Sequence, residues 1–317
     1  MNDVKKIKEA YERIKAHIHR TNLIKSPLLS KEVDGEVYLK LENEQYTGSF
    51  KARGSLNKLL TLTDEEKNRG VVTASTGNHG LGFSRACAIT NATGIVFLPE
   101  TAAKAKVKKL RDYPVELKFV EGTSLQTEIA AKAYASSDQM TWVSPYNDHD
   151  VLHGQGTIAC ELMEQLGSID AVFATVGGGG LISGIASYLK DQSPHTTIYG
   201  CQPSLSPEMS LSVTAGKVIS LEENLPTLSD GSAGGIEADS VTLAYCQRFI
   251  NEFVLITEEE IKDAIKRIAY DHNKIIEGAA GVSVSSVLKK KDQLKGKTSV
   301  VVICGGNISL DIFKQII

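Results

Sequence analysis

The sequence lacks the features that mark several classes of protein. Residues 1–20 carry charges throughout and have no apolar core of the kind that defines a signal peptide. No run approaches the roughly 20 apolar residues that a membrane-spanning helix needs. The net charge of −3 gives no reason to expect nucleic acid or an anionic membrane as a partner.

Cysteine pairs are also missing. The five cysteines are scattered along the chain and form no C-x-x-C motif. An odd number of dispersed cysteines argues against a disulfide framework, and the missing pairs argue against a structural zinc site. We therefore expect a protein of the reducing cytoplasm.

The chain instead shows a regular alternation of apolar, β-rich runs with helical patterns. One expected helix covers Ala102–Arg111, and another covers Glu258–Tyr270 behind a capping box from Thr257 to Glu260. Such alternation predicts an α/β fold with mostly parallel sheets that carry helices on both faces. The expected strands are Val37–Lys40, Val71–Ser75, Gly94–Leu98, Glu116–Val120, Ala171–Val176, Thr197–Gln202, Glu252–Ile256 and Ser299–Cys304.

The length of 317 residues suits two domains. A βαβαβα block in the middle of the chain predicts a small inserted domain, residues 61–148. The large domain would then be built from both ends of the chain, residues 1–60 and 149–317. The stretch Ser204–Gly235 is rich in Ser, Pro and Gly, and we expect it to be a long, partly ordered loop.

Four consecutive glycines, residues 177–180, give the strongest local signal. They join an apolar strand to a helical pattern, and a structural turn needs only one or two glycines. Four allow a ligand to approach successive backbone N–H groups at a helix N-terminus, which makes an anion site, usually for phosphate. The alternatives are a flexible turn or a dinucleotide site, although the acidic residue that a dinucleotide site needs further along is missing. The expected ligand is a small phosphorylated cofactor.

Two further strand ends carry polar groups. Ser75, Thr76, Asn78 and His79 follow the strand that begins at residue 71, and hydroxyls beside a helix N-terminus suit a carboxylate. An elaborate N-cap with His79 on the surface explains the same residues equally well. Cys304 ends the last strand, where a small core residue is the ordinary interpretation. Because ligands of open α/β sheets bind beyond the carboxyl ends of the strands, all three turns are expected to face one crevice.

The segment S-F-K-A-R-G, residues 49–54, raises the question whether Lys51 is a surface charge or a reactive amine. Ser49 is expected to cap a helix, which places Lys51 in the first turn. A cation there opposes the positive end of the helix dipole, and burial would also favour the neutral amine. A lysine with a depressed pKa near a phosphate site has the parts for a Schiff base with pyridoxal phosphate. Arg53 points to another side of the helix and is interpreted as structural.

The motifs S-F-K-A-R-G, A-S-T-G-N-H-G, V-G-G-G-G-L and C-G-G-N stand in the order, and at about the spacing, of a known family. Along essentially its whole length the chain resembles the fold-type II pyridoxal-phosphate enzymes, in the serine/threonine dehydratase (threonine ammonia-lyase) and serine racemase branch. The resemblance implies a tryptophan synthase β-like fold with two open, twisted, mostly parallel sheets and the cofactor in the cleft between the domains. It also implies a homodimer or a dimer of dimers.

The resemblance implies roles for individual residues. Lys51 would hold the cofactor as a Schiff base and then remove the Cα proton, and Thr76 is the second catalytic candidate. Phe50 would pack beside the cofactor ring, Asn78 would bond its phenolic oxygen, and Cys304 would face the pyridine nitrogen. The other expected cofactor contacts are Gly177, Gly178, Gly179, Gly180, Leu181, Asp230–Gly231 and Glu277. The expected carboxylate-binding residues are Ser75, Thr76, Gly77 and His79.

The implied activity is dehydration and deamination of L-threonine or L-serine to 2-oxobutanoate or pyruvate with release of ammonia. A thiol at position 304 does not force protonation of the ring nitrogen, which suits β-elimination. Serine racemisation is an alternative because Thr76 keeps a hydroxyl where racemases carry a serine. A dehydratase of 3-hydroxyaspartate is disfavoured because Thr127 stands where such enzymes tend to have an arginine. A nicotinamide-dependent oxidoreductase and a non-catalytic cofactor-binding protein are the remaining, weaker alternatives.

The residues also argue against a bound metal ion. Relatives with a divalent-metal site, for Mg²⁺ or Ca²⁺, have an acidic residue where this chain has Gln202. Near Gln202 and Ser206, Glu208 is the sole charged candidate ligand, which is too little for a hard cation.

Overall fold

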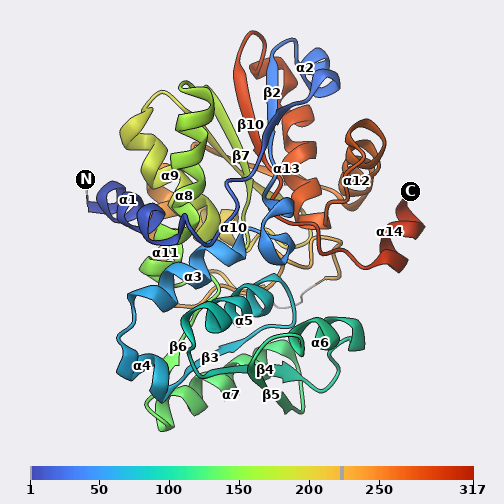
Figure 1. The fold of residues 1–317 in the computed structure, drawn as a ribbon. Coiled ribbons are helices and arrows are strands. Elements are labelled where there is room, and N and C mark those ends of the chain that lie inside the picture. Colours follow the sequence, from blue (N-terminus) through green and yellow to red (C-terminus); the bar gives the residue numbers. More distant parts are fainter. Residues whose placement is uncertain (1, 222–224) are drawn as a thin grey trace.

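The computed structural model describes residues 2–221 and 225–317 and contains two sheets, which lie at the top and the bottom of the view in Figure 1. The larger sheet is parallel except for its edge strand β1, which runs antiparallel to β2. Its order is β1 (Leu23–Lys25), β2 (Glu36–Lys40), β10 (Thr298–Val302), β7 (Ala171–Thr175), β8 (Thr197–Pro203) and β9 (Glu252–Ile256). The smaller sheet is parallel throughout, in the order β5 (Val115–Val120), β4 (Gly94–Pro99), β3 (Val71–Ala74) and β6 (Thr141–Trp142).

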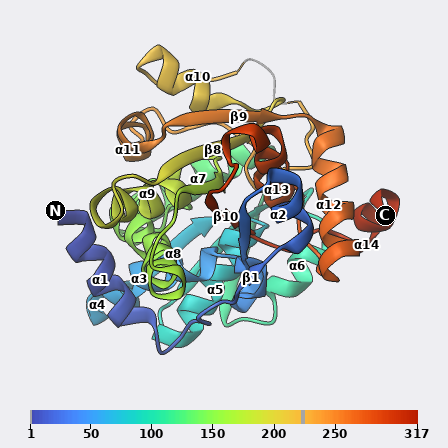
Figure 2. The ribbon, with the colours of Figure 1, turned by 90° about the horizontal axis from the view of Figure 1, so that it is seen from above.

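Helices cover both faces of each sheet (Figure 1). On the larger sheet, α8 (His149–Leu166) and α9 (Gly180–Gln192) lie on one side, and α12 (Glu258–His272) and α13 (Gly278–Lys289) on the other. On the smaller sheet, α5 (Asn78–Thr90) and α6 (Lys104–Leu110) lie opposite α7 (Ser124–Ser137). Figure 2 shows α10 (Glu208–Ala215) and α11 (Val241–Phe249) beside β9. The remaining helices are α1 (Asn2–Ile14), α2 (Pro27–Val33), α3 (Lys51–Thr61), α4 (Asp64–Arg69), α14 (Leu310–Ile316) and the 3₁₀ turns η1 (Glu42–Glu44), η2 (Tyr46–Gly48) and η3 (Lys291–Gln293).

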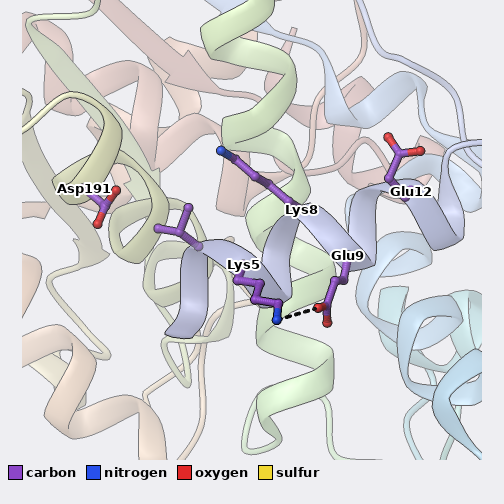
Figure 3. A pocket seen from close by; sticks show the side chains of 6 residues that line it. Lys5, Lys8, Glu9, Glu12 and Asp191 are labelled. Carbon is purple, nitrogen blue, oxygen red and sulfur yellow. Dashed lines mark ion pairs between the residues drawn. The ribbon is translucent and has the colours of Figure 1, made fainter. Parts of the chain in front are cut away.

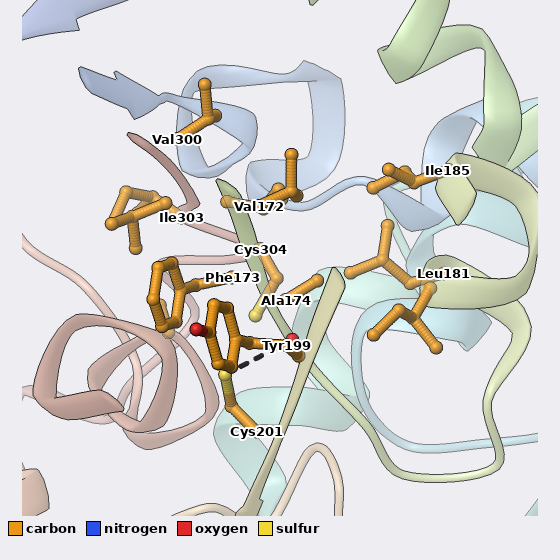
Figure 4. Packing of buried hydrophobic residues seen from close by; sticks show 14 of the residues in the cluster. Val172, Phe173, Ala174, Leu181, Ile185, Tyr199, Cys201, Val300, Ile303 and Cys304 are labelled. Atoms are coloured by element: carbon orange, nitrogen blue, oxygen red, sulfur yellow. Dashed lines mark hydrogen bonds between the residues drawn. The ribbon is translucent and has the colours of Figure 1, made fainter. Parts of the chain in front are cut away.

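The central strands of the larger sheet are buried on both faces, as their continuous apolar runs require. Phe173 of β7 and Tyr199 of β8 stack with ring centroids 4.5 Å apart, within the cluster that Figure 4 shows. Val300 of β10 pairs with Val172 of β7 in parallel register. The turns that follow β7 and β10 therefore emerge at the same edge of the sheet.

Most of the expected elements are confirmed. All eight predicted strands are present within one or two residues at each end, and Thr257 and Glu260 form the capping box of α12. The missed strands β1 and β6 have three and two residues, too few for a periodic pattern. The loop expected over Ser204–Gly235 was partly wrong, because α10 lies within it, and its residues 222–224 lie outside the described residues. Over the part of the chain that the structure describes, no helix is both long and apolar enough to span a bilayer.

Candidate functional site

A cavity of about 570 Å³ opens beyond the carboxyl ends of β7 and β10. Its wall contains Gly177–Gly180 after β7, Cys304 after β10, and Asn78, which follows β3 of the smaller sheet. Lys51, the first residue of α3, lies in the same wall. The other expected site residues in the wall are Phe50, Leu181, Gly231 and Glu277. The structure thus brings the turns after β7 and β10, the lysine segment and Asn78 of the turn after β3 to one cavity, whereas Ser75, Thr76 and Gly77 are not among its described lining residues.

Lys51 is held with its amine inside the protein. Its Nζ donates a hydrogen bond to the Pro145 carbonyl at 2.7 Å. Burial lowers the pKa of this amine to about 8, although the nearby Cys304 and Glu277 act in the opposite direction. The interpretation of Lys51 as a surface charge is therefore wrong.

The start of α3 differs from the expectation that Ser49 caps it. Phe50 occupies the N-cap position without a side-chain hydrogen bond, and Ser49 is extended, with its buried Oγ unpartnered. Ser49 instead forms a bridge with Gly305, and the Phe50 N–H donates to the Cys304 carbonyl at 3.1 Å. Backbone pairing with residues 304–305, just after β10, has overridden the local capping preference. This pairing fixes Lys51 beside Cys304.

The four-glycine turn has no room for side chains. A Cβ on Gly178 would lie 2.4 Å from the Tyr146 ring, and a Cβ on Gly177 would lie 2.8 Å from the Ser232 carbonyl oxygen. Gly179, with φ of +87°, is the N-cap of α9 and adopts a left-handed conformation that other residues rarely adopt. The N-terminus of α9 therefore opens on the cavity through bare backbone, which favours an anion there.

Asn78 belongs to a hydrogen-bonded cluster that spans the two sheets. Its Nδ2 donates to both Glu277 carboxylate oxygens, at 2.8 and 3.0 Å, and its Oδ1 accepts from Asn307 Nδ2 at 2.7 Å. The Asn307 N–H also donates to Glu277 Oε2 at 3.1 Å. Burial raises the pKa of Glu277 to about 7, despite the lowering effect of the Asn78 hydrogen bonds. Asn307 was missed, although it ends the C-G-G-N motif.

Cys304 is buried in the cavity wall. Burial raises the pKa of its thiol well above the ordinary value, and the Glu277 carboxylate adds to the effect. The side chain is therefore a neutral thiol near pH 7. The side chain belongs to the buried apolar cluster of the larger sheet and also lines the cavity, so it packs as a core residue at the position expected for a cofactor contact.

The turn after β3 is arranged differently from the expectation for His79. The His79 ring is buried, with Nε2 at 3.1 Å from the Val143 carbonyl and Nδ1 at 3.5 Å from Ser55 Oγ. Burial lowers the pKa of His79 to about 3, so the ring is neutral. It is neither a surface residue nor part of the cavity wall. A Cβ on Gly77 would meet nothing within 4 Å. The backbone of this turn is therefore accessible at Gly77, whereas the His79 ring is buried.

Ser75 and Thr76 lie beside Gly77, partly buried, in the same turn. Ser75 Oγ accepts a hydrogen bond from the Gly77 N–H at 3.2 Å. Thr127, the position compared with an arginine of other enzymes, is buried on the inner side of α7, where its Oγ1 donates to the Thr123 carbonyl. The α7 residues that line the cavity are instead Ser124, Leu125, Glu128, Ile129 and Lys132.

The suspected metal position is a compact hydrogen-bonded group. Ser206 Oγ donates to Glu208 Oε2 at 2.7 Å, and Gln202 Oε1 accepts from the Ser210 N–H at 2.8 Å. Glu208 Oε1 is buried without a hydrogen-bond partner. Among residues 2–221 and 225–317, no group of three or more His, Cys, Asp and Glu side chains could hold a metal ion.

A second hollow, of about 590 Å³, lies on the surface of α1. Figure 3 shows its charged side chains, among which Lys5 and Glu9 form an ion pair at 3.9 Å. Its lining residues are Val4, Lys5, Lys8, Glu9, Glu12 and Asp191. Long, mobile side chains of both signs and no strand end make it an ordinary surface feature.

Comparisons with known proteins agree with this geometry. The family model described as pyridoxal-phosphate dependent enzyme matches residues 14–305. The L-threonine ammonia-lyase of Thermotoga maritima is 39% identical over 312 residues, which are 98% of this chain and 77% of the relative. The catabolic L-threonine dehydratase TdcB of Escherichia coli is 36% identical over 311 residues, 97% of this chain and 94% of the relative.

Solved structures give the same picture. The serine racemase of Dictyostelium discoideum superposes with a TM-score of 0.90 at 32% identity and covers 97% of this chain and 99% of its own. The processed form of threonine deaminase isoform 2 from Solanum lycopersicum has a TM-score of 0.93 at 29% identity, with 99% of this chain and 86% of its own covered.

Proposed function

Because this chain belongs to the family of pyridoxal-phosphate dependent enzymes, we propose that it dehydrates and deaminates L-threonine and L-serine. The products are 2-oxobutanoate or pyruvate, together with ammonia. The observation that carries the proposal is the position of Lys51, the four-glycine turn and the Cys304 thiol in the wall of one cavity. The threonine ammonia-lyases among the relatives support the choice of reaction.

The residues of the cavity fit the cofactor. With a pKa of about 8, Lys51 has a neutral fraction of about one tenth at pH 7, enough to attack an aldehyde. The open N-terminus of α9 suits the phosphate, held by Gly177–Gly180 and Leu181. Phe50, Asn78, Gly231 and Glu277 would surround the ring, and Cys304 would face its nitrogen.

When bound, pyridoxal phosphate supplies an electron sink for the bond that breaks at the substrate Cα. Lys51 accepts the Cα proton on Nζ, which requires the neutral amine that burial favours. Cys304 carries a neutral thiol, which would not force protonation of a ring nitrogen placed next to it, and a weak electron sink would favour prompt loss of the β-hydroxyl. The β-hydroxyl takes up one proton and leaves as water, so that the Cα proton and the hydroxyl are lost together as one water overall, and the resulting enamine takes up one water to give ammonia and the 2-oxo acid.

The turn after β3 orients the substrate. We assign the substrate carboxylate to the N–H groups of residues 75–79 at the start of α5 and to the hydroxyls of Ser75 and Thr76. His79 contributes through its backbone, since both ring nitrogens have partners inside the protein. The buried ring holds the turn in place.

The direct test is release of 2-oxo acid and ammonia from L-threonine and L-serine by the purified protein. We expect a visible absorption band from bound cofactor and turnover of both amino acids. Lys51→Ala should lose both, while Lys262→Ala, on the surface of α12, should keep both. A colourless wild-type protein that releases no 2-oxo acid would falsify the proposal.

Serine racemisation is the second candidate. The Thr76 hydroxyl and the similarity to the Dictyostelium discoideum serine racemase favour it. Chiral analysis of the serine left after incubation separates the two reactions. D-serine in excess of pyruvate would make racemisation the main activity.

We extend the proposal to the organisation of the chain. Residues 61–148 form a small domain inserted in a large one, residues 1–60 and 149–317, which is supported by a smaller sheet drawn entirely from residues 71–142. A cytoplasmic location is supported by five free, buried cysteines. Resemblance to the dehydratase branch supports a homodimer or dimer of dimers, which sedimentation velocity would test.

A further inference from the structure

In the wall of the cavity, one lysine, Lys132, forms ion pairs with two carboxylates, Glu128 and Glu237. We propose that Glu128, Lys132 and Glu237, here named the rim triad, restrict the site to amino acids with an uncharged β-substituent and reject those with a second carboxylate. The inference rests on the proposed function and adds the substrate class. It places the selectivity on residues that the four sequence motifs do not include.

Lys132, the one cation of the rim triad, is already ion-paired with both of its carboxylates. Lys132 Nζ lies 2.7 Å from Glu128 Oε1 and 2.9 Å from Glu237 Oε2. Partial burial lowers the pKa of Lys132, but its hydrogen bonds to Glu128 and Glu237 outweigh that effect and raise it. The side chain is therefore a permanent ammonium, already paired twice.

The charges of the cavity wall disfavour a second anion. The described lining residues include two lysines, Lys51 and Lys132, the two carboxylates Glu128 and Glu237, and Glu277, which with a pKa of about 7 is half protonated at neutral pH. Lys51 cannot pair with a second substrate carboxylate, because it is assigned to hold the cofactor and to accept the Cα proton. The cofactor phosphate would add further negative charge to the cavity. A substrate carboxylate beyond the one at the turn after β3 would meet uncompensated negative charge and no available cation.

The rim triad is also coupled to the reacting end of the cavity. Ser144 Oγ and Asn147 Nδ2 donate to Glu237 at 3.4 and 3.2 Å, and the Glu237 N–H donates to the Tyr146 hydroxyl at 2.8 Å. The carbonyl of Pro145, within the same short segment, accepts from Lys51 Nζ. Residues 144–147 thus position both the reactive amine of Lys51 and the carboxylate of Glu237, which would repel a second substrate carboxylate.

The test compares substrates by charge. We would measure kcat/KM for L-serine and for L-threo-3-hydroxyaspartate, which differ at the β-carbon by one carboxylate. In the double variant Glu128→Gln, Glu237→Gln, the ratio for hydroxyaspartate over serine should rise by about tenfold or more, since a released ammonium replaces two repelling charges. Adding Lys132→Gln should cancel most of the gain. An unchanged ratio in the double variant, or a gain that survives loss of Lys132, overturns the inference.

A binding measurement separates this inference from the proposed function. Calorimetric titration of the holoprotein with succinate and with butyrate reports the charge selectivity without turnover. The double variant should raise the succinate-to-butyrate affinity ratio by about tenfold, and the triple variant should return it toward the wild-type value. If neither the wild type nor the variants turn over any substrate but the affinity ratios change as described, the proposed function is wrong and the charge selectivity is supported. If L-serine is consumed and neither ratio moves, the selectivity alone is wrong.

Discussion

Asn78 Nδ2 lies 2.8 Å from Glu277 Oε1 and joins the first residue of α5 to the N-cap residue of α13. One helix follows a strand of the smaller sheet, and the other packs on the larger sheet. The pair therefore spans the two sheets at the cavity wall. It also keeps a buried carboxyl close to the amine of Lys51.

Glu277 should make stability depend on pH. Its pKa is raised from 4.5 to about 7, so the folded protein holds a proton between these values that the unfolded chain releases. The free energy of unfolding therefore falls as pH rises through this window. The free energy of unfolding of Glu277→Gln, compared with that of wild type, should therefore rise by up to about 3 kcal/mol as the pH is raised from 4.5 to 8. Urea denaturation of the cofactor-free proteins measures it, with the exposed Glu259→Gln as control. A difference that is flat with pH would contradict the buried-carboxyl account.

Lys51 should react with amine-selective reagents at lower pH than other lysines. Burial lowers its pKa to about 8, whereas the Glu259 hydrogen bond raises the pKa of Lys262. In the cofactor-free protein, the acylation rate of Lys51 should therefore rise with a midpoint near pH 8. Peptide mass spectrometry after brief labelling resolves the two sites. A midpoint for Lys51 equal to that for Lys262 would show that the amine is hydrated.

Gly178→Ala should weaken cofactor binding by at least about tenfold, because the new Cβ and the Tyr146 ring compete for the same space and the turn must move. Gly235→Ala is the matched control, since it lines the same cavity but a Cβ there meets nothing within 4 Å. Fluorescence titration of the cofactor-free proteins with pyridoxal phosphate gives both affinities. Equal losses in the two variants would mean that crowding at Gly178 is not the cause.

Arg53→Met should cost about 3–5 kcal/mol of stability, because it leaves two buried carboxylates without their shared partner. The Arg53 guanidinium pairs with Glu42 Oε1 and Glu161 Oε1, each at 2.7 Å, and all three side chains are fully buried. Arg267→Ala removes the partly exposed pair with Glu32 and should cost at most about 1 kcal/mol. Chemical denaturation at pH 7 measures both. Similar costs for the two variants would rule out a structural role for the buried network.

Local patterns predicted the parts of the site that depend on the backbone. The four-glycine turn follows its strand as expected, and the strands before the other two turns end within two residues of their predicted ends. Parallel strands of one sheet share a carboxyl edge, so the meeting of the turns after β7 and β10 followed from the predicted topology, whereas Asn78 reaches the cavity from the smaller sheet. The same logic failed at Ser49, because capping preference is weak compared with the backbone pairing that Gly305 offers.

Side chains with distant partners could not be predicted in this way. Arg53 was interpreted as structural without a partner, and its partner Glu161 lies 108 residues further along the chain. The surface position considered for His79 was wrong, because the carbonyl of Val143 and the hydroxyl of Ser55 hold its ring inside, and only its backbone is left for the proposed carboxylate site. The periodicity of α7 does not reveal that Thr127 faces inward while Lys132 reaches Glu237.

The sequence by itself determined the fold class and the backbone turns, because hydrophobic period and glycine placement act over a few residues. The cofactor followed from the family resemblance that the four motifs carry. Only the tertiary structure decided which charges are buried and paired. The pKa of the Lys51 amine is lowered because Pro145 and the surrounding protein enclose it. Lys132 is not available to pair with a substrate carboxylate because Glu128 and Glu237 both pair with it. A pKa and a pairing depend on burial and distance in space, which residues far apart in the chain create together.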